Sequence, residues 1–592
     1  MLTKLLIVII IMELFIASLM PLTINAEELK LPLKIDIDIA IILINVSILN
    51  KDYLKSQLPR NYSSYITLDN LQRAINYYIN YTIIEAPYTL CSRLNKYMLE
   101  IGKKGPLPRY IRDYLFHVHP RWKWQEAIYV NATSIEEWLA HNMNNYIDTN
   151  VEYILILINI PWLKRPRVYY VSNQNRSYIG FIAFGGNYPI YFIDLSTIPK
   201  PYPEPEYALS NYGIGVNFNN TKPIWDIKSE FELIEILKNY ISNFVNYIVV
   251  SDYVSLPNYS ENYHLNIAIL NYRDPENKSP LTININYLKK MLYSLVPYTN
   301  WSIDITTING SQYPKILQVI NNSTTINNWI VLEYKDLISA LVKEGFLNYT
   351  YGWNYTYVPC IIVIAEKPLY LTYKLELNFT AIATPNGIVV SYPGYAHRVI
   401  RDGIERIIAH EMGHMLGLVH PFEKVIDNET EIKWLYDWIV SPMSYSPLLL
   451  GWKGGIFVFD SNKLCIMHWF SIAKKLEAMN KFKNCTYHEV REYYYESYKY
   501  LTKGKCVPFY NSIGAITYII KAYKLALMTK CKNRNIVKTI INEEYTSTPS
   551  IQSTSTHKKS SIQEIFSLSF YIIFILIIIC ITLYIIIKGF KF

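Results

Sequence analysis

Apolar side chains recur at two different spacings along the N-terminal part of the chain. Residues 34–49, 153–160 and 188–195 are runs rich in Ile, Leu and aromatic side chains, which is typical of buried strands. Residues 68–83 combine Leu, Ile, Ala and Tyr with polar residues in a pattern that we assign to a helix. These four segments predict an α/β region before residue 260.

The middle of the chain carries a strand, a helix and a second strand in close succession. Residues 264–272 and 301–308 are β-rich runs, and residues 285–298 between them carry apolar side chains at helical spacing. This order within a short stretch predicts a βαβ crossover.

A hairpin is predicted shortly after this crossover. Residues 359–366 are largely apolar and are interpreted as a buried strand. Residues 378–393 consist of two strand-like runs on either side of Pro385-Asn386-Gly387. Because an Asn-Gly pair is a strong local hairpin signal, we expect the two runs to pair.

Three helices are predicted towards the C-terminal end. Residues 470–482, 487–501 and 515–527 place Leu, Ile and aromatic side chains in stripes at helical spacing, and we interpret the stripes as packing surfaces. Four cysteines in the same region would pin these helices to one another: Cys465, Cys485, Cys506 and Cys531.

Both ends of the chain carry apolar segments. Lys4, the apolar residues up to Leu22 that Glu13 interrupts, and the small Ala26 indicate a signal peptide, with an uncleaved signal anchor as the alternative. Residues 565–587 contain no charged residue and are long enough to cross the ~30 Å hydrocarbon core of a bilayer. The sequence therefore predicts a single-pass protein of the cell membrane with the bulk of the chain extracellular.

Charge and cysteine usage add to this picture. The formal net charge of +9 is spread thinly over 592 residues without a basic block, so no nucleic-acid partner is expected. Asn-x-Ser/Thr sequons recur along the chain and permit glycosylation. Of the seven cysteines, Cys580 lies in the predicted span, which leaves an even number outside it. We expect disulfides within the C-terminal group of four and a third between Cys91 and Cys360.

The motif HEMGHMLGLVH, residues 410–420, holds three of the eleven histidines. On a helix, His410 and His414 project from one face a turn apart, which suits two ligands of one ion. Gly417 can take the left-handed conformation that ends the helix, so that His420 returns as a third ligand. Three imidazoles leave zinc one open coordination site, which is the mark of a catalytic centre.

Glu411 lies beside the first of these histidines, where its carboxylate can take a proton from water. One alternative is that the motif is a helix with surface histidines. Another is a zinc site whose third ligand is Glu429 or Glu431, although both are nearer to the helix than such sites usually place it. The other histidines that we considered are interpreted as ordinary polar or packing residues: His117, His119, His397 and His468.

These residues resemble the metzincin clan of zinc metalloproteases, whose signature is H-E-x-x-H-x-x-G-x-x-H followed by a methionine turn. The sequence SPMSYS supplies that methionine as Met443, which the resemblance implies is an apolar floor beneath the zinc ligands. Tyr445 matches the tyrosine that astacins and serralysins place beside the metal, where it helps to stabilise the oxyanion. The sequence HPFE, residues 420–423, is more similar to serralysins and matrixins than to archaemetzincins. The abundance of Tyr, Asn and Ile resembles extracytoplasmic proteins of archaea.

The resemblance covers roughly residues 264–460 and implies an α+β fold. It implies a catalytic domain with a mixed twisted sheet, an active-site helix and a C-terminal subdomain that holds the methionine turn. It also implies one catalytic zinc ion, and an edge strand at residues 378–384 that pairs with an extended peptide. The expected organisation is a signal peptide (1–26), an N-terminal α/β accessory domain or propeptide (27–260), the peptidase domain (261–460), a helical region pinned by disulfides (461–540), a Ser/Thr-rich stalk (541–564), a transmembrane helix (565–587) and a cytoplasmic tail (588–592).

The leading functional expectation is a membrane-anchored extracellular zinc endopeptidase that acts on proteins or peptides, with Glu411 as general base. The competing expectation is a glycosylated surface protein, structural or adhesive, with a zinc site that is not catalytic. Glu411 argues against it, because a structural site needs no general base. A third possibility is a processing enzyme kept latent by its N-terminal region, with Cys91 capping the zinc as a thiolate.

Overall fold

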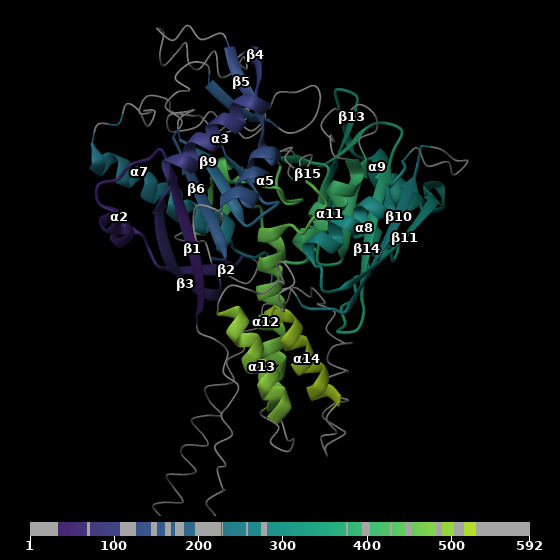
Figure 1. Cartoon of the computed structure of the whole chain (residues 1–592). Coiled ribbons are helices and arrows are strands. Elements are labelled where there is room, and N and C mark those ends of the chain that lie inside the picture. Colours follow the sequence, from purple (N-terminus) through teal and green to yellow (C-terminus); the bar gives the residue numbers. More distant parts are fainter. Residues whose placement is uncertain are drawn as a thin grey trace, which may run out of the picture. The chain divides into compact units, whose positions relative to one another are not determined.

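A computed structural model describes most of the chain between residues 34 and 528 (Figure 1). The described residues are 34–67, 72–106, 126–143, 151–159, 167–171, 183–195, 227, 229–255, 258–273, 281–373, 377–392, 403–426, 429–445, 452–480, 488–502 and 514–528. All of them belong to one compact unit, residues 1–541, and residues 542–592 form a second. The predicted signal peptide, stalk, transmembrane helix and tail lie outside the described residues.

The N-terminal region is built on a six-stranded sheet with the order β2-β3-β1-β6-β9-β8. Its four inner strands are parallel, and each edge strand pairs antiparallel with its neighbour. The inner strands β6 and β9 are buried along their whole length, as expected of strands covered on both faces, whereas β1 and β3 also carry exposed polar side chains. The strands are β1 (Ile35–Ile44), β2 (Asn61–Ile66), β3 (Gln72–Glu85), β6 (Tyr153–Ile158), β8 (Ala183–Gly185) and β9 (Ile190–Asp194).

The strands predicted from residues 34–49, 153–160 and 188–195 are confirmed, but the helix predicted at 68–83 is wrong. Residues 72–83 belong to β3 instead, and residues 68–71 lie outside the described residues. Ile75, Tyr77, Ile79 and Tyr81 are buried at alternate positions, which is the period of a strand with one covered face. The pairing of β3 with both β1 and β2 therefore overrides the local pattern that we assigned to a helix.

A five-stranded mixed sheet with the order β11-β10-β14-β18-β17 lies in the middle of the chain. Strand β10 (Asn262–Asn271), helix α8 (Ile285–Leu295) and strand β11 (Asn300–Asn309) form the predicted parallel βαβ crossover. Strand β14 (Thr356–Ile364) is also confirmed, and it pairs with β10 and β18 in parallel.

The predicted hairpin joins β17 (Ala381–Thr384) to β18 (Gly387–Tyr392), with Gly387 at a φ of +141°. This makes β17 the antiparallel edge of the five-stranded sheet. The edge strand expected over residues 378–384 is shorter than predicted, because β16 (Leu377–Phe379) pairs with β15 (Leu369–Tyr373) in a separate four-stranded sheet.

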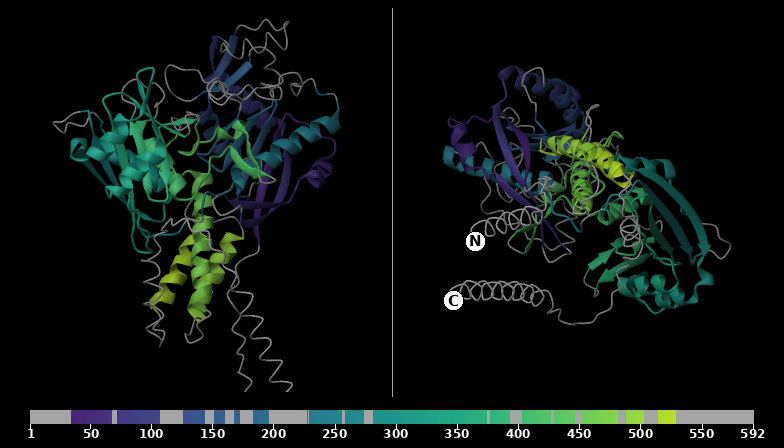
Figure 2. Two further views of the ribbon diagram at one scale, coloured as in Figure 1. Left: turned by 180° about the vertical axis from the view of Figure 1, so that it is seen from behind. Right: turned by 90° about the horizontal axis from the view of Figure 1, so that it is seen from below.

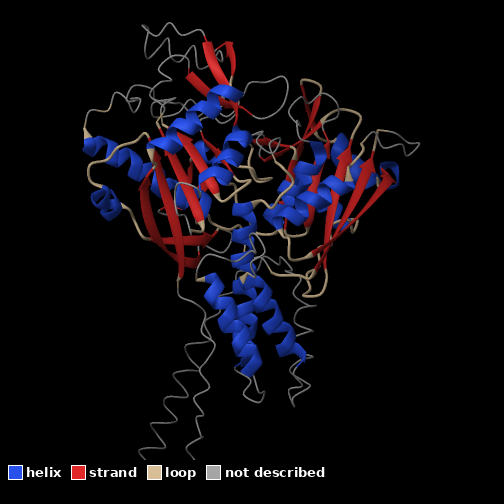
Figure 3. Ribbon diagram, viewed as in Figure 1, coloured by secondary structure: helices blue, strands red, loops and turns tan. Residues whose placement is uncertain are grey.

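Helices cover both faces of the five-stranded sheet (Figure 3). One face packs against α8 and α11 (Gly403–Met415), and the other against α9 (Pro314–Asn321) and α10 (Tyr334–Lys343). The remaining elements are α2 (Lys51–Gln57), α3 (Tyr88–Ile101), α5 (Ala132–Asn142), α7 (Glu230–Asn243), the π-helix η5 (Phe244–Val249), the 3₁₀ turns η6 (Gly310–Gln312) and η8 (Trp434–Asp437), β4 (Lys103–Pro106), β5 (Glu126–Asn131), β7 (Arg167–Val171), β12 (Thr324–Ile326), β13 (Trp329–Glu333), β19 (Glu423–Ile426) and β20 (Glu429–Ile432).

The three predicted C-terminal helices are α12 (Val458–Asn480), α13 (His488–Leu501) and α14 (Ala515–Met528). They lie side by side in both views of Figure 2, and α14 contacts the other two. Their apolar residues join one face of the six-stranded sheet, α7 and η5 in a single hydrophobic cluster. A second cluster joins the other face of that sheet to α8 and α11. The apolar clusters thus continue across the predicted domain boundaries at 260 and 460.

The fold is mixed α/β, consistent with the expected α+β class. The Cys91–Cys360 disulfide is wrong, because both thiols are free and buried. Cys465 is disulfide-bonded to a partner outside the described residues, where the other three cysteines of its group lie.

The predicted localisation as a single-pass membrane protein needs correction. Among the described residues, no helix has both the length and the apolar character needed to cross a membrane. The longest of the described helices is α12, but charged side chains interrupt its apolar pattern. The segment 565–587, on which the prediction was based, lies outside the described residues.

Candidate metal centre

Helix α11 presents the first two histidines of the motif and ends where the sequence predicts. The amide of Gly417 donates to the carbonyl of His414 (2.9 Å), and the amide of Leu418 donates to the carbonyl of Gly413 (2.9 Å). This pair of bonds is the Schellman arrangement, which needs a left-handed residue after the helix. Gly417 supplies it with a φ of +93°. The chain therefore turns back and brings His420 to the helix.

The three histidines come together as predicted. One ring nitrogen from each of His410, His414 and His420 lies within 4.8 Å of the other two. The Nε2 atoms of His410 and His420 are 3.2 Å apart. Among the described residues, this is the group of side chains able to hold a metal ion.

Each imidazole has an oxygen atom close to its Nδ1 atom. His410 Nδ1 lies 2.9 Å from the carbonyl oxygen of Pro442, and His414 Nδ1 lies 2.8 Å from that of Leu418. His420 Nδ1 lies 2.9 Å from Oε1 of Glu423. Because all three partners are acceptors, we assign the ring proton to Nδ1, which leaves each Nε2 lone pair for a metal.

The electrostatic environment favours neutral imidazoles. Burial and the neighbouring histidines hold the pKa of His410 well below its usual value, and they lower the pKa of His414 to about 3. Metal ligation requires the neutral ring. Three neutral imidazoles that converge in this way could hold a metal ion.

Glu411 is buried beside these ligands and faces the five-stranded sheet. Its carboxylate accepts a hydrogen bond from the backbone amide of Ala383 in the edge strand β17. Burial raises the pKa of Glu411 to about 8, and the Ala383 bond offsets part of that increase. The edge strand β17 and helix α11 are thus joined through the Glu411 carboxylate.

The predicted methionine turn lies directly beneath α11. Met443 is fully buried, and its amide donates to Oγ of Ser441 (2.9 Å). Ser441 Oγ also bonds to Asp460, at the start of α12. Arg406, one turn before His410, donates to the carbonyl of Ser444. These contacts fix the turn on the side of α11 that carries the histidines.

Tyr445 places its ring next to two ligands. Its centroid is 4.7 Å from that of His420 and 5.5 Å from that of His410. The Tyr445 amide donates to Oδ1 of Asp437 (2.8 Å), which fixes the backbone, while the side chain is 39% exposed. The tyrosine is therefore beside the predicted metal and open to an incoming ligand.

The alternatives to this ligand set are not brought to the centre. Glu431 accepts a hydrogen bond from the Tyr247 hydroxyl (2.7 Å) and pairs with Lys433 (3.0 Å), and the side chain of Glu429 is not described. Cys91 lies on α3, where its thiol donates to the carbonyl of Ala86, and burial raises its pKa. Neither Glu431 nor Cys91 belongs to the described metal-binding group.

Of the four histidines interpreted as polar or packing residues, only His468 lies among the described residues. His468 is buried and contacts the Tyr298 hydroxyl through Nδ1 (2.9 Å), which agrees with its interpretation as a packing residue. His117, His119 and His397 lie outside the described residues.

Two contributors to the centre were missed in the sequence. Glu423 holds the third histidine, and its signal was an acidic residue three positions after His420. Gly413 lies in the middle of α11, where a Cβ would come within 2.1 Å of Met443 Sδ. A glycine inside a helix costs about 1 kcal/mol relative to alanine, so its presence was a sign of close packing.

Comparison with protein families finds no family model that matches the chain, and comparison with curated proteins finds no match either.

Proposed function

We propose that this chain is a zinc-dependent endopeptidase. The observation that carries the proposal is the convergence of three anchored imidazoles with a buried carboxylate, Glu411, that is tied to a sheet edge. A zinc site that only stabilised a fold would be closed by a fourth protein ligand, and no fourth member is present among the described residues. The resemblance to metzincins rests on the same residues and supports the same proposal.

Zinc bound at these histidines would polarise a substrate carbonyl and acidify water. Glu411 accepts the proton from water on its carboxylate and passes it to the leaving nitrogen of the peptide. Its raised pKa suits both steps, because a carboxyl group that titrates near neutrality can take up and release a proton. Tyr445 donates a hydrogen bond to the negative charge that develops on the carbonyl oxygen.

The edge strand β17 is the proposed binding site for the peptide backbone. The Ser391 amide donates to the carbonyl of Thr380 (2.7 Å). In the alternating antiparallel pattern, the backbone N–H and C=O groups of residues 380, 382 and 384 therefore point towards β18. The backbone groups of Ala381 and Ala383 then face away from the sheet, on the side of Glu411. An extended peptide pairing there would lie along the metal centre.

The test is cleavage of a mixed peptide library by the purified chain, followed by mass spectrometry of the products. We expect internal cleavage that a zinc chelator abolishes and that added zinc restores. Stoichiometric zinc without any cleavage would favour the hypothesis of a surface protein whose zinc site is not catalytic.

A further inference from the structure

The backbone of residues 251–254 joins the N-terminal sheet to the loop that carries the third histidine. We call residues 417–425 the zinc loop. On one side, the Tyr253 amide donates to the carbonyl of Tyr65 (2.8 Å), and the Thr67 amide donates to that of Tyr253 (2.8 Å). On the other side, the Val254 amide donates to the carbonyl of Gly417 (2.8 Å). The glycine that redirects the chain towards His420 is thus held by the N-terminal region.

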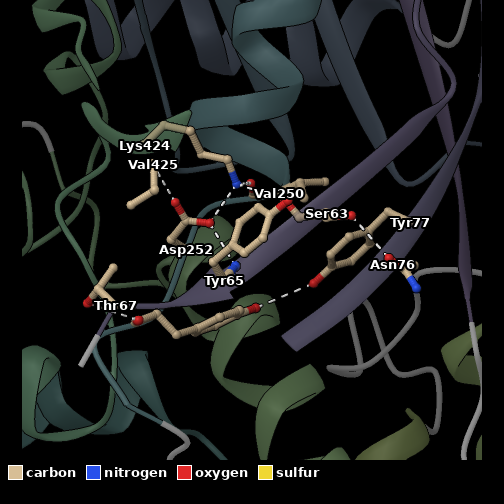
Figure 4. Close-up of polar contacts among 10 residues, drawn as sticks. Ser63, Tyr65, Thr67, Asn76, Tyr77, Val250, Asp252, Lys424 and Val425 are labelled. Atoms are coloured by element: carbon tan, nitrogen blue, oxygen red, sulfur yellow. Dashed lines mark hydrogen bonds and ion pairs between the residues drawn. The ribbon is translucent and has the colours of Figure 1, made fainter. Parts of the chain in front are cut away.

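A buried ion pair reinforces this connection (Figure 4). Lys424 Nζ lies 2.7 Å from Oδ1 of Asp252, and the two side chains are 3% and 1% exposed. Lys424 also donates to the carbonyls of Ser63 (3.0 Å) and Val250 (2.9 Å), so its three protons all have acceptors. An ammonium group removed from water needs such full pairing.

Asp252 also accepts a hydrogen bond from the backbone of the zinc loop. Its Oδ2 accepts from the amide of Val425 (2.7 Å), and its Oδ1 accepts from the amide of Tyr65 (2.9 Å). The Asp252 carboxylate therefore contacts strand β2, the side chain of Lys424 and the backbone amide of Val425. Lys424 lies four positions after His420, next to the Glu423 that holds the histidine ring.

The methionine turn also contacts the N-terminal region. The Val440 amide donates to the carbonyl of Gly185 at the end of β8 (2.7 Å), and the Tyr191 hydroxyl of β9 donates to the carbonyl of Leu435 (2.7 Å). Glu136 of α5 in turn accepts from the Tyr188 amide between these strands (2.9 Å). Both segments that complete the centre after α11 are thus positioned by residues before 260.

We propose that the N-terminal region is a permanent wall of the metal centre, not a removable propeptide, and that Asp252 is a positioning residue for the third ligand, His420. The inference rests on the proposed function, because it concerns the same histidines. It assigns to Asp252 a role in metal affinity that does not involve contact with the metal or the substrate.

Substitutions at the ion pair test the role of Asp252. In Asp252→Asn and in Lys424→Met we expect zinc to dissociate about 10–100-fold more readily, the usual effect of disturbing a group that orients a ligand. The control is Tyr81→Phe, which removes buried hydrogen bonds to Tyr62 and Pro59 within the same sheet. It should leave zinc affinity within about twofold of wild type. Folded Asp252→Asn and Lys424→Met proteins with wild-type zinc affinity would overturn the proposal.

Hydrogen exchange of the unaltered chain gives a test that does not depend on the variants folding. Zinc should slow amide exchange in residues 63–67 and 250–254 as well as in residues 410–425, with α3 as the unaffected reference. Slowing confined to residues 410–425 would show that the N-terminal wall is not coupled to the ligands, and would overturn this inference alone. No slowing in any segment would instead count against the zinc site of the proposed function.

Discussion

The sulfur of Met443 occupies the space that a side chain at Gly413 would need: a Cβ added there would lie 2.1 Å from Sδ. The helix that carries His410 and His414 and the turn that carries Met443 are therefore in direct contact. Glycine at position 413 is required for this contact, although it weakens the helix itself by about 1 kcal/mol relative to alanine.

We expect Gly413→Ala to destabilise the protein by about 1–3 kcal/mol, the usual cost of overpacking a core, in spite of the better helix propensity of alanine. Chemical denaturation measures the change in the free energy of unfolding. Gly455→Ala is the matched control, because a Cβ at Gly455 meets nothing within 4 Å. Its effect should stay within about 0.5 kcal/mol. A Gly413→Ala protein as stable as wild type would show that Met443 moves aside freely.

Glu423 should control metal affinity without taking part in the chemistry. It holds Nδ1 of His420, and although its burial acts to raise its pKa, the interactions with His420 keep that pKa below the usual value. We expect Glu423→Ala to weaken zinc binding about 10–100-fold in a chelator competition assay. Glu431→Ala, a carboxylate on the neighbouring strand that contacts Tyr247 and Lys433, should not weaken it. Equal effects of the two substitutions would contradict the assigned role.

We expect the free energy of unfolding to depend on pH because of Glu136. Burial raises its pKa to about 7, while hydrogen bonds from Asn187 and Tyr188 act against that increase. The folded state therefore binds a proton more tightly than the unfolded state, so the contribution of Glu136 to stability falls as the pH rises from about 4.5 to about 7. The full change is about 3 kcal/mol, from roughly 1.4 kcal/mol for each pKa unit.

Thermal unfolding of wild type and Glu136→Gln between pH 4 and pH 8 checks this sign. The glutamine stays neutral, so wild type should lose stability relative to the variant as the pH rises. A difference that is independent of pH would show that Glu136 titrates at the same pH in the folded and unfolded states.

Tyr445→Phe should slow peptide cleavage while leaving the zinc content unchanged. The ring packs beside His410 and His420, and phenylalanine keeps that packing while removing the hydroxyl. Loss of one oxyanion donor costs at most about 10²–10³-fold in kcat. Steady-state kinetics together with metal analysis measures both quantities. Loss of zinc from the variant would assign Tyr445 to the metal site and not to oxyanion stabilisation.

Local sequence signals predicted those parts of the structure that depend on local spacing. The positions of His410 and His414 on one helix face, the turn at Gly417 and the hairpin at Gly387 all follow from residues a few positions apart. The strand β3 was assigned to a helix because its burial depends on pairing with β1 and β2, which the local pattern does not contain. The edge strand was drawn too long for the same reason, since β16 pairs with β15.

The residues that position the metal centre could not be predicted from the sequence, for a related reason. Asp252 and Lys424 are far apart in the sequence, and each is an ordinary surface residue type in its local context. The prediction of a Cys91–Cys360 disulfide paired residues by count, whereas the fold buries each of them as a free thiol. Long-range packing determines all of these contacts, so they become visible only in the folded chain.

The most direct test of the proposed function compares zinc content and peptide cleavage in wild type and Glu411→Ala. Glu411 contacts Ala383 and lies beside the ligands, but it is not a member of the metal-binding group. We expect about one zinc per chain in both proteins and a loss of cleavage at or beyond the upper end of the 10²–10⁴-fold that general acid–base catalysis typically contributes. A Glu411→Ala protein that holds zinc, folds normally and keeps most of the cleavage activity would contradict it.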